Sequence, residues 1–489
     1  MLKNIALYVV IIGLFVGAVL LILHLGAQLP PGAAEPVARP DISAAAPPRP
    51  ADSADSPFRL FLEQLRHPLA ILLMQFIVIV GTARVVGGLF RKIGQPSVVG
   101  EMVAGILLGP SLLGLIWPQS QSFFFPASSM PTLRLISQVG VIVYMFLVGI
   151  HVDLGRLRQK AHAAVLVSHA SIVVPFFLGT ALCLFIYPAL APSNISFTAF
   201  ALFLGIAMSI TAFPVLARIV DERGLMGTFL GNTTIACAAV DDVTAWCLLA
   251  LVVAVAGAGG LGGAALTVAL TVGFIALMLF VVRPQAARFV DRQQRRETVG
   301  KGLVAGVLIF AFASALFTEV IGIHALFGAF LAGAVMPANS RLRSFLRDRL
   351  ETFTTVLLLP LFFAFTGLRT QIGLLADPQS WLMCLIVILV AVAGKFGGSA
   401  LAARWTGIGW KNSLAIGVLM NTRGLMELIV LNIGYDMGIL SPRIFAMLVL
   451  MALGTTFMAG PLLSLLCIGG PDSEETADRQ VAHAKSNRS

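Results

Sequence analysis

The sequence contains few charged residues for its length. Of its 489 residues only 11% are charged, whereas 58% are hydrophobic and the mean hydropathy is +0.93. A chain of this composition cannot hide its apolar surface in a soluble core. It is therefore expected to be an all-α polytopic membrane protein. The net charge of +10 comes from basic residues in short loops, so it indicates membrane topology and not nucleic-acid binding.

Paired cysteines are missing as well. The five cysteines lie singly in apolar stretches, with neither CxxC spacing nor neighbouring histidines, so packing is their expected role. They are Cys183, Cys237, Cys247, Cys384 and Cys467. No motif for an enzyme or for a bound cofactor stands out, and we expect neither.

The N-terminal part of the chain differs from the rest. Residues 5–25 form an apolar segment longer than the roughly 7–15 residues of a signal-peptide core, which favours a retained membrane anchor within 1–28 over a cleaved signal. Residues 29–66 are rich in Pro, Ala, Ser and Asp and predict an extracytoplasmic linker. A transmembrane domain is expected at 67–467 and a short cytoplasmic tail at 468–489.

The main apolar region divides into about thirteen segments of membrane length. Basic residues gather in every second loop, beginning with the loop after the first segment. By the positive-inside rule these loops and the C-terminus are cytoplasmic, in a membrane of the bacterial inner type. The expected spans lie near 68–90, 97–115, 133–152, 163–187, 196–219, 226–256, 262–283, 301–320, 323–338, 352–368, 380–403, 412–435 and 443–467.

An internal repeat is visible within these spans. Residues 100–110 of the second span resemble 328–338 of the ninth, because each stretch has a Gly, then Ala-Gly, then a Pro. The following span ends in Phe-Leu-Val-Gly149 in one half and Phe-Thr-Gly367 in the other. Spans seven apart have opposite orientations, so the two copies are inverted. The sequence thus predicts two inverted five-helix repeats, with a transporter-type site at mid-membrane. They cover about 97–256 and 323–467.

Two spans at matching places carry residues that interrupt helices. The fifth contains Pro214 behind hydroxyl side chains, and the twelfth contains Asn-Thr-Arg-Gly ahead of Glu427. We expect both helices to break and to cross at mid-depth, where freed backbone groups line a cavity. The alternatives are an ordinary kink at Pro214 and a structural i,i+4 ion pair between Arg423 and Glu427. The expected cavity residues are Ser209, Thr211, Pro214, Asn421 and Thr422.

Asp241 and Asp242 are adjacent in the apolar sixth span. Carboxylates at such depth are costly, so they must meet water, a cation or a partner charge, or hold a proton. Neighbours on a helix point about 100° apart, so one can line a cavity while the other faces a packed helix. Lys395, near the middle of the eleventh span and flanked by glycines, is the candidate counter-charge.

The chemistry of this trio is competitive. Desolvation favours a protonated acid, whereas a cation in the cavity favours the carboxylate, so proton and cation exclude one another at one site. Opening such a site alternately to the two sides of a membrane exchanges one for the other. Two coupled carboxylates titrate as a pair.

Several stretches together resemble one transporter family. The chain is similar, over about residues 68–467, to the monovalent cation:proton antiporter-2 family, and the plant cation/proton exchangers look closest. The resemblance is carried by Gln-Pro-Ser-Val-Val-Gly-Glu at 95–101, Ser-Ile-Thr-Ala-Phe-Pro-Val-Leu-Ala-Arg at 209–218, Ala-Val-Asp-Asp-Val-Thr-Ala-Trp at 239–246, Pro-Leu-Phe-Phe-Ala at 360–364 and Asn-Thr-Arg-Gly-Leu-Met-Glu-Leu at 421–428.

The resemblance implies roles for these residues. Asp242 would bind Na⁺ or K⁺ and the proton, Asp241 would pair with Lys395, and the breaks near Thr211 and Asn421 would cross beside them. It also implies an elevator-like motion of a core against a scaffold that forms a homodimer in the bilayer, and electrogenic exchange. The family's potassium-efflux relatives carry a large C-terminal nucleotide-binding domain, whereas only about twenty polar residues follow Cys467 here, so gating through such a domain is not expected.

Three other functions are alternatives to exchange. A cation channel or uniporter could use the same acidic cavity, although inverted repeats with a buried lysine favour exchange. An intramembrane aspartyl protease needs its carboxylates on separate helices. A sensor with a degenerate transporter fold would not need Asp241, Asp242 and Lys395. Two remaining polar residues, His324 and Arg369, are expected to be a packing histidine and a solvated arginine at the outer end of the tenth span.

Overall fold

The computed structural model describes residues 2–34, 67–151, 161–226, 228–257, 261–294, 301–337, 341–466 and 468. Within these ranges the chain is helical, and the one β-type contact is an isolated bridge between Ala34 and Pro192. Most of the predicted linker at 29–66, the loop at 152–160 with its basic residues, and the tail after 468 lie outside the described residues.

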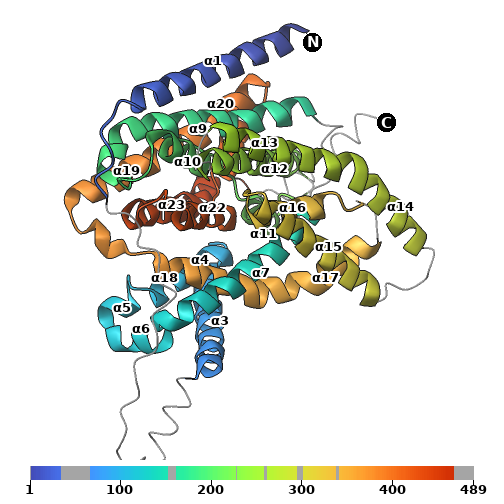
Figure 1. Cartoon of the computed structure of the whole chain (residues 1–489). Coiled ribbons are helices and arrows are strands. Elements are labelled where there is room, and N and C mark those ends of the chain that lie inside the picture. The colour runs from blue at the N-terminus through green and yellow to red at the C-terminus, as the bar shows by residue number, and fades with distance from the viewer. Residues whose placement is uncertain are drawn as a thin grey trace, which may run out of the picture.

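Figure 1 shows the helices as a bundle of long, roughly aligned segments with shorter broken ones inside it. Several helices begin at a proline, which loses no helical hydrogen bond in the first turn. The helices of the first half are α1 (Leu2–Gly26), α3 (Pro68–Lys92), α4 (Ser97–Leu108), α5 (Leu113–Ile116), α6 (Pro118–Phe124), α7 (Met130–His151), α9 (Ala161–Leu190), α10 (Phe197–Ser209), α11 (Phe213–Glu222) and α12 (Phe229–Gly257). Those of the second half are α13 (Leu261–Ala276), α14 (Arg283–Gln294), α15 (Lys301–Val320), α16 (Ala325–Ala334), α17 (Arg341–Phe353), α18 (Leu359–Arg369), α19 (Pro378–Val392), α20 (Gly398–Trp405), α21 (Trp410–Met420), α22 (Leu425–Asp436) and α23 (Pro442–Leu465).

Eleven helical segments in the described part of the chain are long and apolar enough to cross a membrane, or twelve if the bent pair α21 and α22 is one span. These agree with twelve of the thirteen segments expected from hydropathy. The ninth expected span, 323–338, corresponds to α16, which has 10 residues and is shorter than the roughly 20 that a helix needs to cross the bilayer. The count of thirteen therefore stays a prediction.

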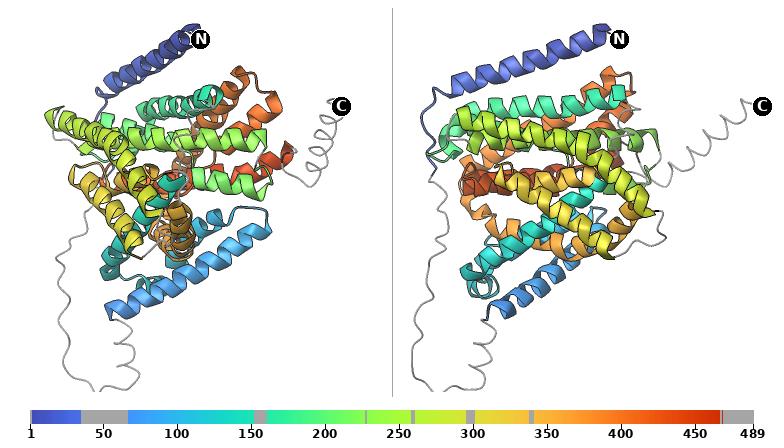
Figure 2. Two further views of the ribbon diagram at one scale, coloured as in Figure 1. Left: turned by 90° about the vertical axis from the view of Figure 1, so that its right-hand side faces the viewer. Right: turned by 45° about the vertical axis from the view of Figure 1, so that its right-hand side comes forward.

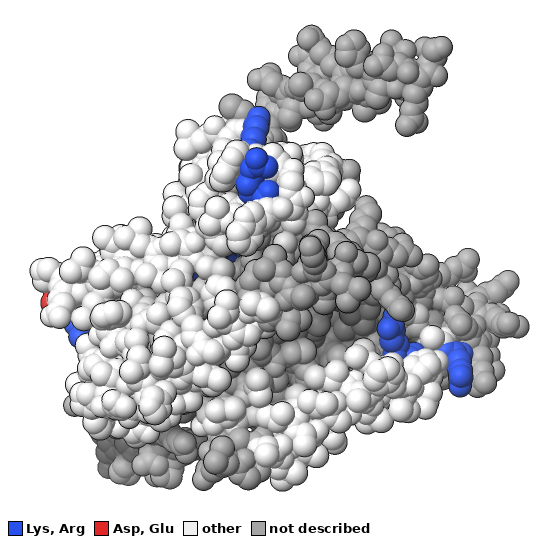
Figure 3. Space-filling model, turned by 90° about the horizontal axis from the view of Figure 1, so that it is seen from above, with Lys and Arg blue, Asp and Glu red and all other residues white. Residues whose placement is uncertain are grey.

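The outer surface is suited to lipid. Seen from above, the described atoms form a broad surface with only a few charged side chains (Figure 3). Large apolar side chains stand exposed along α3 and α13, among them Ile77 and Leu266. In water such a surface would aggregate, whereas in a bilayer it meets acyl chains.

Two close glycine contacts join helices from the two halves. A Cβ on Gly105 of α4 would lie 2.2 Å from the carbonyl oxygen of Phe363 in α18, and one on Gly367 of α18 would lie 2.0 Å from the backbone of Gly105. In the same way Gly149 of α7 meets the backbone of α16, where Gly333 lies opposite. In the predicted repeat Gly105 matches Gly333 and Gly149 matches Gly367. The repeat therefore maps the Gly105–Gly367 contact onto the Gly333–Gly149 contact, as expected of inverted copies.

The N-terminal helix α1 packs along α9 and α10, on the side of the bundle opposite α3 (Figures 1 and 2). Phe15 of α1 meets Phe177 of α9 edge to face, with ring centroids 5.5 Å apart. After the helix, the backbone N–H groups of Ala33 and Ala34 donate to the carbonyls of Pro188 and Ala191. This segment thus contacts α9 from the middle of α1 and again just after its C-terminal end. Its retention in the mature protein stays a prediction.

Candidate ion-binding site

The two expected helix interruptions are present and touch each other. The first lies between α10 and α11, where Pro214 cannot donate to the carbonyl of Ile210 and its ring would clash with it. The second lies between α21 and α22, which are bent by 42°. The backbone N–H of Ala212 donates to the carbonyl of Thr422 at 3.1 Å, and the Thr211 hydroxyl donates to the carbonyl of Met420 at 3.2 Å.

Gly424 explains how closely the broken helices approach. A Cβ at this position would lie 2.7 Å from Cγ2 of Val215 in α11, inside the contact distance of real side chains. Glycine therefore lets the start of α22 pack directly against the start of α11. The crossing brings the free ends of four half-helices together inside the bundle.

Asp241 of α12 is fully buried and fully paired. Its carboxylate accepts hydrogen bonds from the hydroxyls of Ser168 at 2.6 Å, Ser171 at 2.7 and 2.8 Å, and Thr211 at 2.6 Å. It also forms an ion pair with Lys395, whose Nζ lies 2.9 Å from Oδ2. Both side chains are inaccessible to solvent. The carboxylate is held by donors from α9, the first helix break and the lysine.

Lys395 belongs to η5 (Ala393–Gly397), a π-helical stretch between α19 and α20. Such π-bulges are frequent at functional sites because they shift side chains relative to a regular helix. The ammonium donates to Asp241, to the carbonyl of Ser171 at 2.9 Å and, closely, to the carbonyl of Ser209. All three of its N–H donors are thus satisfied.

Asp242 differs sharply from its neighbour. It is only 1% exposed, yet neither carboxylate oxygen has a hydrogen-bond partner among the described residues. The backbone N–H of Phe213, at the start of α11, faces the carboxylate but lies outside hydrogen-bonding geometry. The Asn421 side-chain oxygen in the second break is also buried without a partner among the described residues. Buried polar atoms of this kind are rare in folded proteins unless a ligand or a proton fills the site.

A second buried ion pair stabilises the crossing. Arg423 lies 3.0 Å from Glu427 and both side chains are inaccessible, so the expected i,i+4 pair is present. The guanidinium also donates to the carbonyls of Ala207 at 2.8 Å and Met208 at 2.6 Å, near the end of α10. Because the C-terminal end of a helix carries partial negative charge, Arg423 and Lys395 together neutralise the last carbonyls of α10.

The predicted site residues therefore come together from distant parts of the chain. Thr211, Asp241 and Lys395 share one hydrogen-bond network, to which Ser209 contributes its carbonyl. Pro214 lies in the first turn of α11 beside it. Sequence reasoning missed three hydroxyls: Ser168 and Ser171, which hold Asp241, and Thr456, which bonds the backbone of Arg423. The i,i+3 spacing of the two serines in an apolar span was the available signal.

One expectation at the periphery is wrong. Arg369 was expected to be solvated, but its side chain is 15% exposed and forms an ion pair of 2.8 Å with Asp436. Its guanidinium also stacks on Phe365, 4.1 Å from the ring centroid. The ends of the tenth and twelfth spans lie side by side, which hydropathy alone does not reveal.

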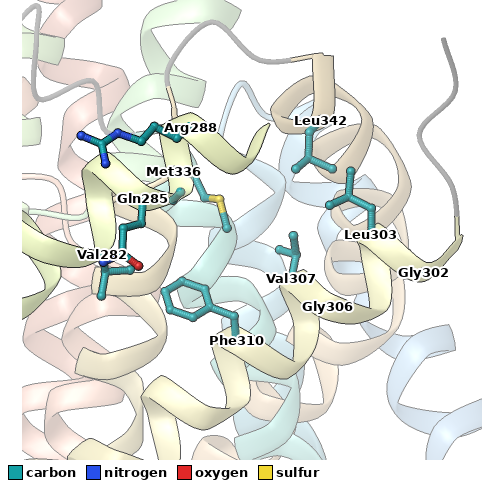
Figure 4. Close-up of a pocket in the computed structure, with 11 residues that line it drawn as sticks. Val282, Gln285, Arg288, Gly302, Leu303, Gly306, Val307, Phe310, Met336 and Leu342 are labelled. Carbon is teal, nitrogen blue, oxygen red and sulfur yellow. The ribbon is translucent and has the colours of Figure 1, made fainter. Parts of the chain in front are cut away.

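A groove of about 590 Å³ lies apart from this network (Figure 4). Its lining is mostly apolar, with Arg288 and Gln285 at one edge, and it contains none of the predicted site residues. The remaining lining residues are Val282, Ala286, Gly302, Leu303, Gly306, Val307, Phe310, Met336 and Leu342. Among the described residues no cluster of three or more His, Cys, Asp or Glu side chains could hold a metal ion.

Comparison with known sequences decides the family. A profile of the transmembrane domain of sodium/hydrogen exchangers matches residues 77–469. The chain belongs to the sodium/hydrogen exchanger family. Members of this family are transporters and not enzymes, so the chain is a multi-pass membrane transporter of the cation/proton antiporter type.

The names of proteins related to this exchanger mention two different cations. The Na(+)/H(+) antiporter NhaS4 of Synechocystis is 44% identical over 81% of this chain and 97% of its own length. Cation/H(+) antiporter 17 of Arabidopsis thaliana is 40% identical over 82% of this chain, and K(+)/H(+) antiporter 1 of Saccharomyces cerevisiae is 32% identical over 83%. The chain spans about half the length of the plant and yeast relatives, 48% and 47%.

A solved exchanger structure supports the fold. The sodium proton antiporter MjNhaP1 from Methanocaldococcus jannaschii superposes with a TM-score of 0.59, covering 82% of this chain and 98% of its own, at 13% sequence identity. The helical exchanger fold expected from the resemblance is therefore confirmed. The inverted repeat and the homodimer stay predictions.

Proposed function

We propose that this chain exchanges protons for a monovalent cation, Na⁺ or K⁺, by alternating access, with Asp242 as the group that binds either ion. The observation that carries the proposal is the contrast between two adjacent carboxylates. Asp241 is saturated with donors and paired with Lys395, whereas Asp242 is equally buried and has no partner among the described residues.

Charge balance explains why such a site couples two ions. Asp241 and Lys395 neutralise each other, so the site carries one net negative charge when Asp242 is ionised and empty. A proton or a monovalent cation on Asp242 removes that charge. An uncompensated buried charge costs several kcal/mol, so the empty, ionised carrier is disfavoured. Moving the site between the two sides of the membrane is then tied to carrying one ion or the other.

The finer aspects of the proposal follow the same line. The unpartnered Asn421 oxygen in the second break is a candidate further cation ligand, since hard cations bind carboxylate and amide oxygens. Relatives named for Na⁺ and for K⁺ leave the cation open between these two. We also propose a homodimer in a plasma or inner membrane with a cytoplasmic C-terminus, on the loop charges and the family resemblance.

Transport by purified protein tests the central assignment. Proteoliposomes with an imposed pH gradient and an internal pH indicator receive Na⁺, K⁺ or Li⁺ in turn. We expect native protein to dissipate the gradient with Na⁺ or K⁺, and Asp242→Asn to behave like empty liposomes. Asp377→Asn is the matched control, because it also converts an acid to an amide but at a site 45% exposed. Cation-driven proton movement unchanged in Asp242→Asn would show that another group carries the ions, and cation flux without proton flux would indicate a uniporter.

A further inference from the structure

A second polar cluster lies at the far end of α22 from the ion-binding network. Asp436, at the C-terminal end of this helix, accepts from Arg134 of α7 through Oδ2 at 3.0 Å and pairs with Arg369 of α18 through Oδ1 at 2.8 Å. Each carboxylate oxygen thus holds one arginine from a different helix. Arg369 donates further to the side-chain oxygen of Asn432 at 3.1 Å, and Asn432 donates to the hydroxyl of Thr366 at 2.7 Å. We call these five residues the Asp436 cluster.

The cluster joins helices that otherwise pack in different groups. α7 and α18 pack on each other and on α4 and α16, whereas α22 packs mainly on α23 and α10. The close glycine contact between Gly105 and Gly367 ties α18 to α4 by interlocking backbone, which leaves no room for sliding. The contact between α18 and α22 is small, and its polar part is the Asp436 cluster. Ion pairs and hydrogen bonds can separate and be replaced by water more easily than interlocked backbone.

The position of Asp436 is unfavourable for the helix alone. An acid at the C-terminal end of a helix meets the partial negative charge of the last carbonyls. Asp436 is 19% exposed, and among the described residues its ion pairs are with the two arginines of the neighbouring group. Tyr435 is a further neighbour of the cluster, since its ring centroid lies 5.2 Å from the Arg369 guanidinium. His324, directly before α16, interacts electrostatically with Asp436 and with Glu319 of α15. Asp436 therefore stabilises the contact between the two groups of helices and not α22 itself.

α22 links this junction to the site. Its 12 residues span about 18 Å, from the crossing at Gly424, beside Arg423 and Thr422, to Asp436. A half-helix of this length moves as a rigid element. Movement of its outer end away from α7 and α18 therefore displaces the second helix break, which touches Thr211 through the carbonyl of Met420.

We propose that Asp436 is a positioning residue for exchange. Its bonds to Arg134 and Arg369 hold α22 against α7 and α18 and keep the path from this end of the protein to Asp242 closed. The cluster must separate for the site to open at this end, which the loop charges assign to the outside. This inference rests on the proposed function, because it gives one of the two access states a specific lock.

Side-specific labelling tests the lock without any transport measurement. Thr366→Cys replaces the hydroxyl of the cluster by a thiol at a position that is 1% exposed and leaves both ion pairs of Asp436 in place. Each variant is compared with the same variant lacking this cysteine. A membrane-impermeant maleimide is applied to right-side-out and to inside-out vesicles at one fixed pH. We expect Asp436→Asn to label faster from one side only, by about 5- to 150-fold, the usual range of a conformational coupling. The conservative Asp436→Glu should restore slow labelling.

A control and a second variant keep the test decisive. Asp377→Asn removes another ion pair at the same end, with Arg443, but it joins α19 to α23 within one packing group, so its labelling should equal that of native protein. If Asp436→Asn does not fold, Arg134→Gln decides, with a smaller increase because Arg134 is 39% exposed. Labelling no faster than in Asp377→Asn, or faster from both sides, overturns the proposal. If Asp436→Asn shows the side-specific labelling but Asp242→Asn still transports, the proposed function is rejected and the lock is not.

Discussion

The pairing of Lys395 with Asp241 predicts strong coupling between the two residues in the stability of the protein. Breaking a buried ion pair by removing one partner costs about 3–5 kcal/mol, because the other charge stays buried and unpaired. In Lys395→Met the carboxylate keeps its hydroxyl donors from Ser168, Ser171 and Thr211. In Asp241→Asn the ammonium keeps two carbonyl acceptors. We therefore expect the lower end of that range for each single variant, about 3 kcal/mol.

The double variant Lys395→Met/Asp241→Asn should lose much less unfolding free energy than the two single variants lose in total. With both charges gone, no uncompensated charge remains, and replacement of a buried pair by neutral groups is often close to neutral. If the double variant costs about 1–3 kcal/mol, two singles of about 3 kcal/mol each imply a coupling energy of about 3–5 kcal/mol. The unfolding free energies of the native protein, the two single variants and the double variant are measured on purified protein in mixed micelles, by titration with a denaturing detergent.

A control variant changes another buried polar group close to Lys395 in the chain. Ser399 lies one turn after Lys395, is buried, and its hydroxyl has no hydrogen-bond partner among the described residues. Ser399→Ala should therefore leave the protein at least as stable as the native form, because it removes a buried hydroxyl that has no partner. Single variants whose costs add in the double variant would show that the 2.9 Å contact contributes no net interaction, and the charge-balance argument would lose its basis.

Two further predictions concern packing and pH. Gly105→Ala should prevent stable folding, because its Cβ would lie 2.2 Å from the backbone of α18, whereas Gly81→Ala, with nothing within 4 Å, should be tolerated; monodispersity after purification measures both. Hydrogen bonds from the side chain and backbone of Ser380, with Arg443 adding to them, hold the pKa of Asp377 below its ordinary value. The stabilising contribution of this ionised N-cap is therefore present at neutral pH and is lost as the pH falls through that lowered pKa. In Ser380→Ala the pKa should rise toward the usual value near 4, as read from the ¹³C shift of the Asp377 carboxyl; an unshifted value in Ser380→Ala would refute the assignment of the cause.

Local chemistry explains what the sequence predicted well. Pro214 lies beyond the first turn of the fifth span, where a proline kinks or breaks a helix. A lysine between glycines in a long apolar span must find a counter-charge. The helix breaks and a carboxylate partner for Lys395 could therefore be inferred from single positions, whereas the choice of Asp241 over Asp242 came from the family resemblance. The ninth expected span, 323–338, contains the shorter helix α16 (Ala325–Ala334), because hydropathy counts apolar residues and does not see where a helix ends.

Contacts set by helix rotation and tilt could not be inferred in this way. Ser168 lies 73 residues from Asp241, and Arg134 lies 302 residues from Asp436. Which face each helix turns toward its neighbours depends on the packing of the whole bundle. Arg369 shows the difference clearly, since a residue at the end of a span is solvated unless another helix happens to end beside it with an acid.

The geometry also limits how many protons each turnover can carry. In the proposed exchange, Asp242 alone would account for one proton exchanged against one monovalent cation, which is electroneutral. A second proton, as the expected electrogenic exchange requires, has to come from Asp241 or Lys395, the other ionisable partners in the same network. Neither can supply it while the pair stays closed, because the carboxylate accepts from Lys395 and every donor of the ammonium is used. Electrogenic exchange therefore demands that this ion pair separate when the cation binds, whereas a permanently closed pair restricts the protein to one-for-one exchange.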